Sequence, residues 1–353
     1  MKVLQRICAA GIAALLAVPC FPPMQPKADD APRIVVSLGD SYSSGEGTEP
    51  FYGQDKAPAD KVLDPDWLAH RSTLAWPGLL TLDGTPLSEH RDESWYFVAA
   101  SGACLRHLHE SFPKYYSLPD DGLEGTADLA PQLAVFEDLP RADYVTLTLG
   151  GNDVDFAGVL NSAVSVFGTS DLPAHLDRIW EDFYAEDGIR DEIYRAYYEI
   201  AEAAGDAVII VAGYPHLLKQ EGSYMYNAKN SAMVNAAVDQ LNAEIEGLVT
   251  QCREEGLHIY FAPVTEEFAG HEAYTSDPYI NKVTGSQDED IDRSAAISAY
   301  SVHPNAEGAR AYARAVQKVI DALEEGRIPG EPLPSPLTVT METQDTPAPP
   351  ERP

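Results

Sequence analysis

The chain has 353 residues, 44% of them hydrophobic and 23% charged, a composition typical of a globular protein with a large core. Its 24 basic and 56 acidic residues give a net charge of −32. Nucleic acids and anionic membranes would be repelled, because both are bound by clustered lysine and arginine. We therefore expect no nucleic-acid partner and no stable membrane insertion.

The N-terminal segment predicts an export signal. Residues 1–30 place Lys2 and Arg6 before an apolar run that is too short to span a bilayer comfortably. Cys20 closes this run as a lipidated cysteine would, but Pro19 fits a lipoprotein cleavage site poorly. We expect a secreted, extracellular protein in preference to a lipid-anchored one.

The C-terminal segment predicts a disordered tail. Residues 327–353 are rich in proline and have almost no apolar periodicity, so they cannot bury enough surface to offset the entropy of ordering. Residues 31–326 remain as a single domain, which we expect to be monomeric.

Cys104 and Cys252 are the two cysteines outside the predicted leader. In an exported protein, two such cysteines most simply form one disulfide. The alternative is a metal site of Cys104, His107 and His109, but this spacing is not a zinc signature and lacks a fourth ligand. We therefore expect a disulfide and no metal.

Five short runs predict strands, and most are apolar throughout, as in a parallel sheet that is covered on both faces. They are residues 33–38, 95–99, 144–149, 207–213 and 257–262. Helical periodicity marks residues 191–204, 230–255 and 306–325, the last with Asn305 as its expected N-cap. This alternation predicts an α/β protein, a three-layer α/β/α sandwich around a five-stranded parallel sheet.

Three connections are longer than a crossover helix needs, namely residues 49–94, 161–188 and 268–298. Such loops are often functional, and ligands bind at the carboxyl ends of parallel strands. We expect these connections to wall a substrate pocket. Aromatic candidates for its walls are Tyr42, Trp67, Trp76, Trp95 and Tyr144, although most aromatic residues belong to a core.

The first predicted strand runs into the sequence GDSYSSGEG, residues 39–47. Ser41, between a strand and a helix start, has the setting of a nucleophile, because a helix N-terminus favours negative charge. The alternative is a turn that only caps a helix. The segment is neither a G-x-S-x-G elbow nor a phosphate-binding loop. Asp40 neighbours Ser41 but points to the opposite side of an extended chain, so we expect it to hold the loop.

Three further candidates follow later strands. Gly102 would let a backbone N–H approach a ligand closely. Asn152, in the sequence GGND, could donate to an oxyanion from its side-chain amide. His303 precedes the last helix and suits a general base, with a surface or capping histidine as the alternative. For the other histidines, including His271, the structural interpretation is preferred.

Together these motifs resemble the SGNH/GDSL hydrolase superfamily, which carries Ser, Gly, Asn and His in four ordered blocks. The blocks here are Gly39-Asp40-Ser41, Gly102, Gly151-Asn152-Asp153 and His303-Pro304. The longer strings GDSYSSGEG, SGA (101–103) and FAGH (268–271) resemble the secreted esterase and lipase branch of actinobacteria. The resemblance implies a flavodoxin-like sheet with strand order 2-1-3-4-5. It also implies hydrolysis of a lipid, small-molecule or carbohydrate ester without a cofactor.

The same resemblance implies a role for each matching residue. Ser41 would attack the ester and form an acyl-enzyme. The N–H groups of Ser41 and Gly102 and the side chain of Asn152 would form the oxyanion hole. His303 would take the proton from Ser41 and return it to the leaving alcohol.

The chain departs from the family pattern beside the histidine. The family usually places an aspartate three residues before it, where this chain has Tyr300. A base still needs a fixed tautomer. We therefore expect the main-chain carbonyl of Tyr300 or Ser301 to accept from the imidazole, in preference to a distant carboxylate such as Asp292. A smaller departure is Ala100, where related members often have a cysteine.

Other functions compete with this interpretation. The missing aspartate would also suit a catalytically silent SGNH-fold binding module. A carbohydrate deacetylase would keep the same fold and chemistry. A flavodoxin-like protein with a phosphorylated cofactor is disfavoured, because Asp40 and Glu46 would repel phosphate.

Overall fold

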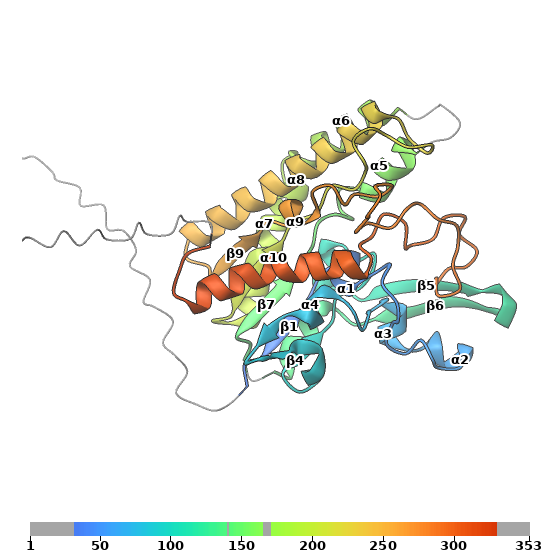
Figure 1. Cartoon of the computed structure of the whole chain (residues 1–353). Helices are drawn as coiled ribbons and strands as arrows, with labels where there is room; N and C mark the ends of the chain where they lie inside the picture. The colour runs from blue at the N-terminus through green and yellow to red at the C-terminus, as the bar shows by residue number, and fades with distance from the viewer. Residues whose placement is uncertain (1–31, 140, 165–170, 330–353) are drawn as a thin grey trace, which may run out of the picture. The chain divides into compact units, whose positions relative to one another are not determined.

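A five-stranded parallel sheet forms the centre of the computed structural model, which describes residues 32–139, 141–164 and 171–329 (Figure 1). Its strand order is β4-β1-β7-β8-β9. The strands are β1 (Val35–Ser37), β4 (Trp95–Phe97), β7 (Tyr144–Leu147), β8 (Val208–Ala212) and β9 (Ile259–Ala262). Each lies within a predicted run, and in chain order the arrangement is 2-1-3-4-5. The predicted parallel sheet and its strand order are therefore confirmed.

The central strands are buried on both faces, as expected for mainly apolar runs in a covered parallel sheet. All residues of β1 and β8 are buried. Val35 of β1 lies between Trp95 of β4 and Tyr144 of β7 in the parallel register. These pairings bring the loops that follow β1, β4 and β7 to the same edge of the sheet.

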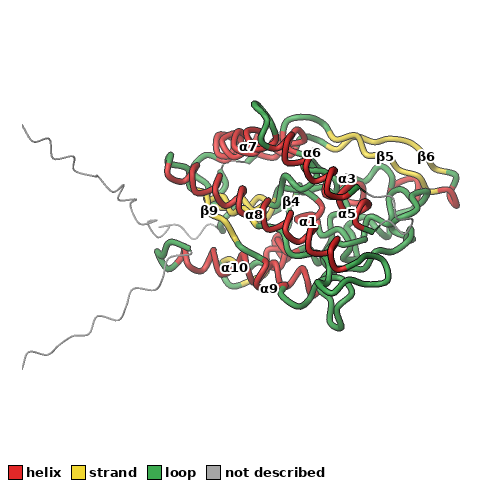
Figure 2. The backbone as a smooth tube through the Cα atoms, turned by 90° about the horizontal axis from the view of Figure 1, so that it is seen from above, coloured by secondary structure: helices red, strands yellow, loops and turns green. Residues whose placement is uncertain are grey.

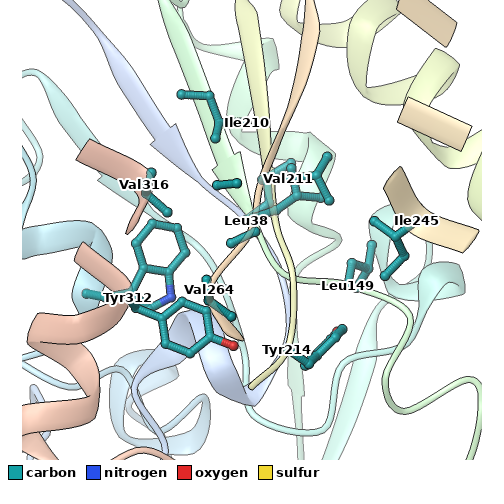
Figure 3. Close-up of a cluster of buried hydrophobic side chains, with 14 of the residues drawn as sticks. Leu38, Leu149, Ile210, Val211, Tyr214, Ile245, Val264, Tyr312 and Val316 are labelled. Carbon is teal, nitrogen blue, oxygen red and sulfur yellow. The ribbon is translucent and has the colours of Figure 1, made fainter. Parts of the chain in front are cut away.

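Helices cover both faces of the sheet, which confirms the predicted three-layer sandwich. Figure 3 shows Tyr312 and Val316 on one side of the strands and Ile245 on the other. Tyr312 and Val316 belong to α10 (Ala306–Glu324), which packs against α4 (Trp76–Leu79) and α9 (Thr265–Phe268). Ile245 belongs to α8 (Ala228–Glu254), which packs against α5 (Phe156–Ala163), α6 (Leu172–Phe183) and α7 (Ile189–Ala204).

Helix α10 begins as its sequence predicts. The Asn305 side chain accepts hydrogen bonds from the N–H groups of Glu307 and Gly308, as an N-cap does. Its buried residues include Tyr312 and Val316, spaced as expected for one face of a helix. Within the described residues, no helix is both long enough and apolar enough to cross a membrane.

The connection 49–94 was expected to be a long loop but is largely structured. It folds into α2 (Pro58–Lys61), α3 (Pro65–Leu68), α4, β2 (Thr81–Leu82), β3 (Thr85–Pro86) and η1 (Leu87–His90). In the connection 161–188 the prediction missed α6, which Asp171 caps. By contrast, residues 269–298 contain neither a helix nor a strand, as expected.

A second feature absent from the prediction is an antiparallel hairpin of β5 (Phe112–Leu118) and β6 (Leu123–Leu129). Figure 2 shows it as a two-stranded ribbon that extends away from the central strands. The 3-10 helices η2 (Leu105–Leu108) and η4 (Gln132–Glu137) flank the hairpin, and η3 (Pro119–Asp121) forms its turn.

The predicted disulfide is absent, because Cys104 and Cys252 are both free. Cys104 follows β4, at the carboxyl edge of the sheet. Cys252 is buried near the end of α8, which leads into the amino end of β9. The two thiols therefore lie at opposite ends of parallel strands. The predicted leader, 1–30, and the predicted tail beyond Pro329 lie outside the described residues.

Candidate active site

Ser41 lies at the carboxyl end of β1, as the first residue of α1 (Ser41–Ser44). The turn into α1 needs Gly39, whose φ is +120°; a Cβ there would lie 2.3 Å from the carbonyl oxygen of Thr148. Asp40 caps α1 by accepting from the N–H of Tyr42 at 3.0 Å. Asp40 therefore holds the loop, as expected.

His303 lies beside Ser41 at the same edge of the sheet. The distance from His303 Nε2 to Ser41 Oγ is 2.8 Å, and that from His303 Nδ1 to the Ser301 carbonyl oxygen is 3.1 Å. A carbonyl only accepts, so Nδ1 carries the hydrogen and Nε2 is free to accept from Ser41. Of the two expected carbonyls, that of Ser301 faces the imidazole; that of Tyr300 accepts the backbone N–H of His303. The carboxylate of Asp292 instead accepts from Ser294.

The loop that carries His303 is tied to the loop that carries Ser41. Tyr42 Oη donates to the Val302 carbonyl at 2.8 Å, and the Tyr42 ring lies 5.0 Å from the His303 ring. The Asn281 N–H donates to the His303 carbonyl, and Asn281 Nδ2 donates to the Gly47 carbonyl. These contacts fix the distance between the two side chains without a carboxylate at the imidazole.

Burial lowers the pKa of His303 below its ordinary value of 6.5, and the charge of Glu46 partly offsets this effect. Glu46 is fully buried and accepts from His70 at 2.8 Å. Burial alone would raise the pKa of Glu46, but the contact with His70 lowers it to about 2. A buried carboxylate therefore lies near His303 but bonds His70 instead.

The three candidate oxyanion donors belong to residues of a single pocket. Ser41, Gly102 and Asn152 line one pocket, together with His303. Within the described part of the chain, no acceptor is found for the N–H of Ser41 or of Gly102. Asn152 donates one amide N–H to the Ala103 carbonyl at 2.8 Å, which leaves its second N–H for a ligand. Gly102 has a φ of +80°, which explains why glycine stands there.

Two residues that the sequence analysis missed connect these loops. Tyr214 Oη donates to Asp40 at 2.5 Å and accepts the N–H of Gly151 at 3.0 Å. Gln132 bonds both the N–H and the carbonyl of Gly39, at 2.7 and 2.8 Å. Neither residue belongs to a recognisable motif, so only the structure identifies them.

The pocket has a volume of about 320 Å³ and is mainly apolar beyond the polar groups at Ser41. Its apolar side chains include Phe156, Leu160, Val164, Leu217, Val238 and Ile297. Of the three long connections that were expected to wall the pocket, 161–188 and 268–298 contribute lining residues, whereas 49–94 contributes none. Of the five aromatic candidates for the pocket walls, Tyr42 alone lines this pocket. The others, Trp67, Trp76, Trp95 and Tyr144, are fully buried core residues.

The alternative metal site is not formed. His107 Nδ1 accepts from the backbone N–H of Cys104, and His109 bonds Glu199. Across the described residues, no group of three His, Cys, Asp or Glu side chains could hold a metal ion. His271 bonds the Asp277 carbonyl and stacks on Tyr279, which fits its expected structural role.

A parallel sheet of this order, with a serine–histidine pair at its carboxyl edge, has the arrangement that the SGNH/GDSL resemblance implies. No family model matches the chain. A lipase of Streptomyces rimosus is 29% identical over 260 residues, which cover 72% of this chain and 80% of the lipase. Lipase 1 of Streptomyces coelicolor is 28% identical over 280 residues, or 78% of this chain and 85% of the relative.

Two solved structures are similar over most of the chain. The extracellular lipase of Streptomyces rimosus has a TM-score of 0.56 and 24% identity, covering 82% of this chain and 99% of its own. Phospholipase A1 of Streptomyces albidoflavus has a TM-score of 0.57 and 22% identity, covering 83% of this chain and 99% of its own. These structures establish the shared fold. With the sequence relatives, they confirm the resemblance to actinobacterial SGNH/GDSL hydrolases and support a carboxylic ester hydrolase.

Proposed function

We propose that the chain is a secreted serine esterase that cleaves carboxylic esters with an apolar acyl group. The observation that carries this proposal is the 2.8 Å contact between Ser41 Oγ and His303 Nε2 at the base of a mainly apolar pocket. Secretion is supported by the N-terminal sequence and by the extracellular lipase among the similar structures.

In the proposed reaction, His303 Nε2 takes the hydroxyl proton as Ser41 Oγ attacks the ester carbonyl. The N–H groups of Ser41 and Gly102 and the Asn152 amide would donate to the resulting oxyanion. The intermediate then collapses, the C–O bond to the alcohol breaks, and His303 gives its proton to the leaving oxygen. A water molecule, deprotonated by His303, hydrolyses the acyl-enzyme and regenerates Ser41.

The pocket favours an acyl chain over a sugar as the group next to Ser41. Leu160, Val164 and Leu217 offer no hydrogen bond to a carbohydrate hydroxyl. A carbohydrate deacetylase is therefore less well supported. The silent binding module is also less well supported, because the Ser301 carbonyl orients the imidazole where the family's aspartate is absent.

Hydrolysis of p-nitrophenyl esters from acetate to palmitate tests the proposal, with Ser41→Ala beside the wild type. We expect hydrolysis that Ser41→Ala abolishes, with chains longer than acetate preferred. A wild type that hydrolyses no ester, and whose Ser41 does not react with a fluorophosphonate, would favour the silent binding module instead.

A further inference from the structure

Lys114 lies beside the candidate oxyanion hole, although no sequence motif places it there. It belongs to β5, where burial alternates so that Phe112, Lys114 and Tyr116 face inward and Pro113 and Tyr115 are exposed. Lys114 Nζ donates to the carbonyl oxygen of Ser101 at 2.6 Å. The hairpin thus brings a cation to the loop that follows β4.

The Ser101 carbonyl and the Gly102 N–H belong to the same peptide unit. A hydrogen bond from an ammonium to the carbonyl oxygen draws electron density from that peptide and makes its N–H a stronger donor. The bond also fixes the peptide plane, and with it the direction of the N–H. Because that N–H has no acceptor in the described part of the chain, it is available to an oxyanion.

The surroundings hold the ammonium in this place. Lys114 Nζ lies 4.8 Å from the centre of the Phe112 ring, which stacks on His107. A Cβ on Gly102 would lie 3.4 Å from the Phe112 ring and 3.9 Å from Lys114 Nζ. Hence β5 places one ring and one cation beside Gly102, which itself stays exposed.

We propose that Lys114 is a positioning residue of the ester hydrolase, which orients and polarises the Ser101–Gly102 peptide for the oxyanion. This inference rests on the proposed function and adds a residue to it. Because Lys114 is absent from the pocket lining, it acts through the peptide and does not touch the substrate.

The charge of Lys114 gives the proposal a pH signature. Burial lowers the pKa of Lys114 to about 8, against the opposing attraction of Glu46. His107, on η2, is a second titratable group beside it, and its pKa is lowered to about 4 by burial and by the cations Arg106 and Lys114. As pH rises through about 8, the ammonium becomes a neutral amine, which polarises the peptide less.

The test compares Lys114→Met and Lys114→Arg with the wild type on p-nitrophenyl butyrate, with active sites titrated. We expect kcat of Lys114→Met to fall about tenfold, with KM within twofold, because a weakened donor costs less than the ~100-fold loss of a whole one. The alkaline decline of the wild-type kcat, with a midpoint near 8, should vanish in Lys114→Met. Lys114→Arg should retain most of the rate and extend the plateau to higher pH.

Controls separate this inference from the proposed function. Lys61→Met removes another largely buried positive charge, one that is paired with Glu289 at 3.3 Å, and should leave kcat unchanged. If Ser41→Ala is inactive but Lys114→Met keeps the wild-type kcat, the positioning role is wrong and the proposed function stands. A loss in Lys114→Met that comes with reduced thermal stability and an unchanged alkaline limb would indicate a merely structural lysine and would also overturn the proposal.

Discussion

Tyr42 Oη donates to the main-chain carbonyl of Val302 at 2.8 Å, joining residues that are 260 positions apart. Val302 has a φ of +56°, which is unfavourable for a β-branched residue. The bond holds this conformation, which directs the Ser301 carbonyl toward His303 Nδ1. Tyr42, the residue after the proposed nucleophile, thus supports the orientation of the His303 imidazole.

Removal of this hydroxyl should impair catalysis more than folding. A neutral hydrogen bond contributes about 1 kcal/mol, and about 1.4 kcal/mol corresponds to a tenfold change in rate. We therefore expect Tyr42→Phe to lower kcat/KM for p-nitrophenyl butyrate by about five- to tenfold. Tyr115→Phe, which removes an exposed bond to Glu124, is the matched control and should match the wild type. Equal activity of the two variants would show that Tyr42 does not support His303.

The pH dependence should report the burial of His303. A histidine acts as a general base only when it is neutral, and burial lowers the pKa of His303, the proposed base, below 6.5. Activity should therefore be lost only as pH falls through this lowered value. We expect the acid limb of kcat/KM to have its midpoint below 6.5, measured on a butyrate ester across the acid range. A midpoint above 6.5 would mean that Glu46 outweighs burial.

Glu46 and His70 form a buried pair whose loss should destabilise the protein. We expect Glu46→Gln to lower the free energy of unfolding by about 3 kcal/mol, the low end of the range for a broken buried pair. Denaturant unfolding at neutral pH measures this change. Glu89→Gln, at an exposed position, is the control and should change stability little.

The same pair predicts a pH dependence of stability. The pKa of Glu46 is lowered from 4.5 to about 2, so its contribution is complete above pH 4.5 and is lost as pH falls toward 2. The difference between wild type and Glu46→Gln should therefore shrink across that window. A constant difference down to pH 2 would argue that packing, not charge, stabilises this site.

The sheet and the Ser41–His303 pair could be predicted because each has a local signal. Each strand of the sheet lies in a short, mainly apolar run of the sequence, and Ser41 and His303 stand in short motifs beside predicted elements. The hairpin was missed because β5 carries Lys114 at an inward position and so breaks the apolar alternation that β6 keeps. Tyr214 and Lys114 lie outside every motif, and only the folded chain brings them to the site. Helix α6 did carry an amphipathic pattern after Asp171, which the long-loop interpretation overlooked.

Leu160 offers the most direct test of the acyl pocket. It lies on α5 and lines the cavity, so a larger side chain there should shorten the space for an acyl chain. We expect Leu160→Trp to lower kcat/KM for octanoate and longer esters by about tenfold, while acetate stays within twofold. Leu63→Trp adds the same ring at a position that is 70% exposed and should leave the chain-length profile unchanged. An equal loss on all esters would instead indicate damage to the Ser41–His303 pair, and no change on any ester would place the acyl chain elsewhere.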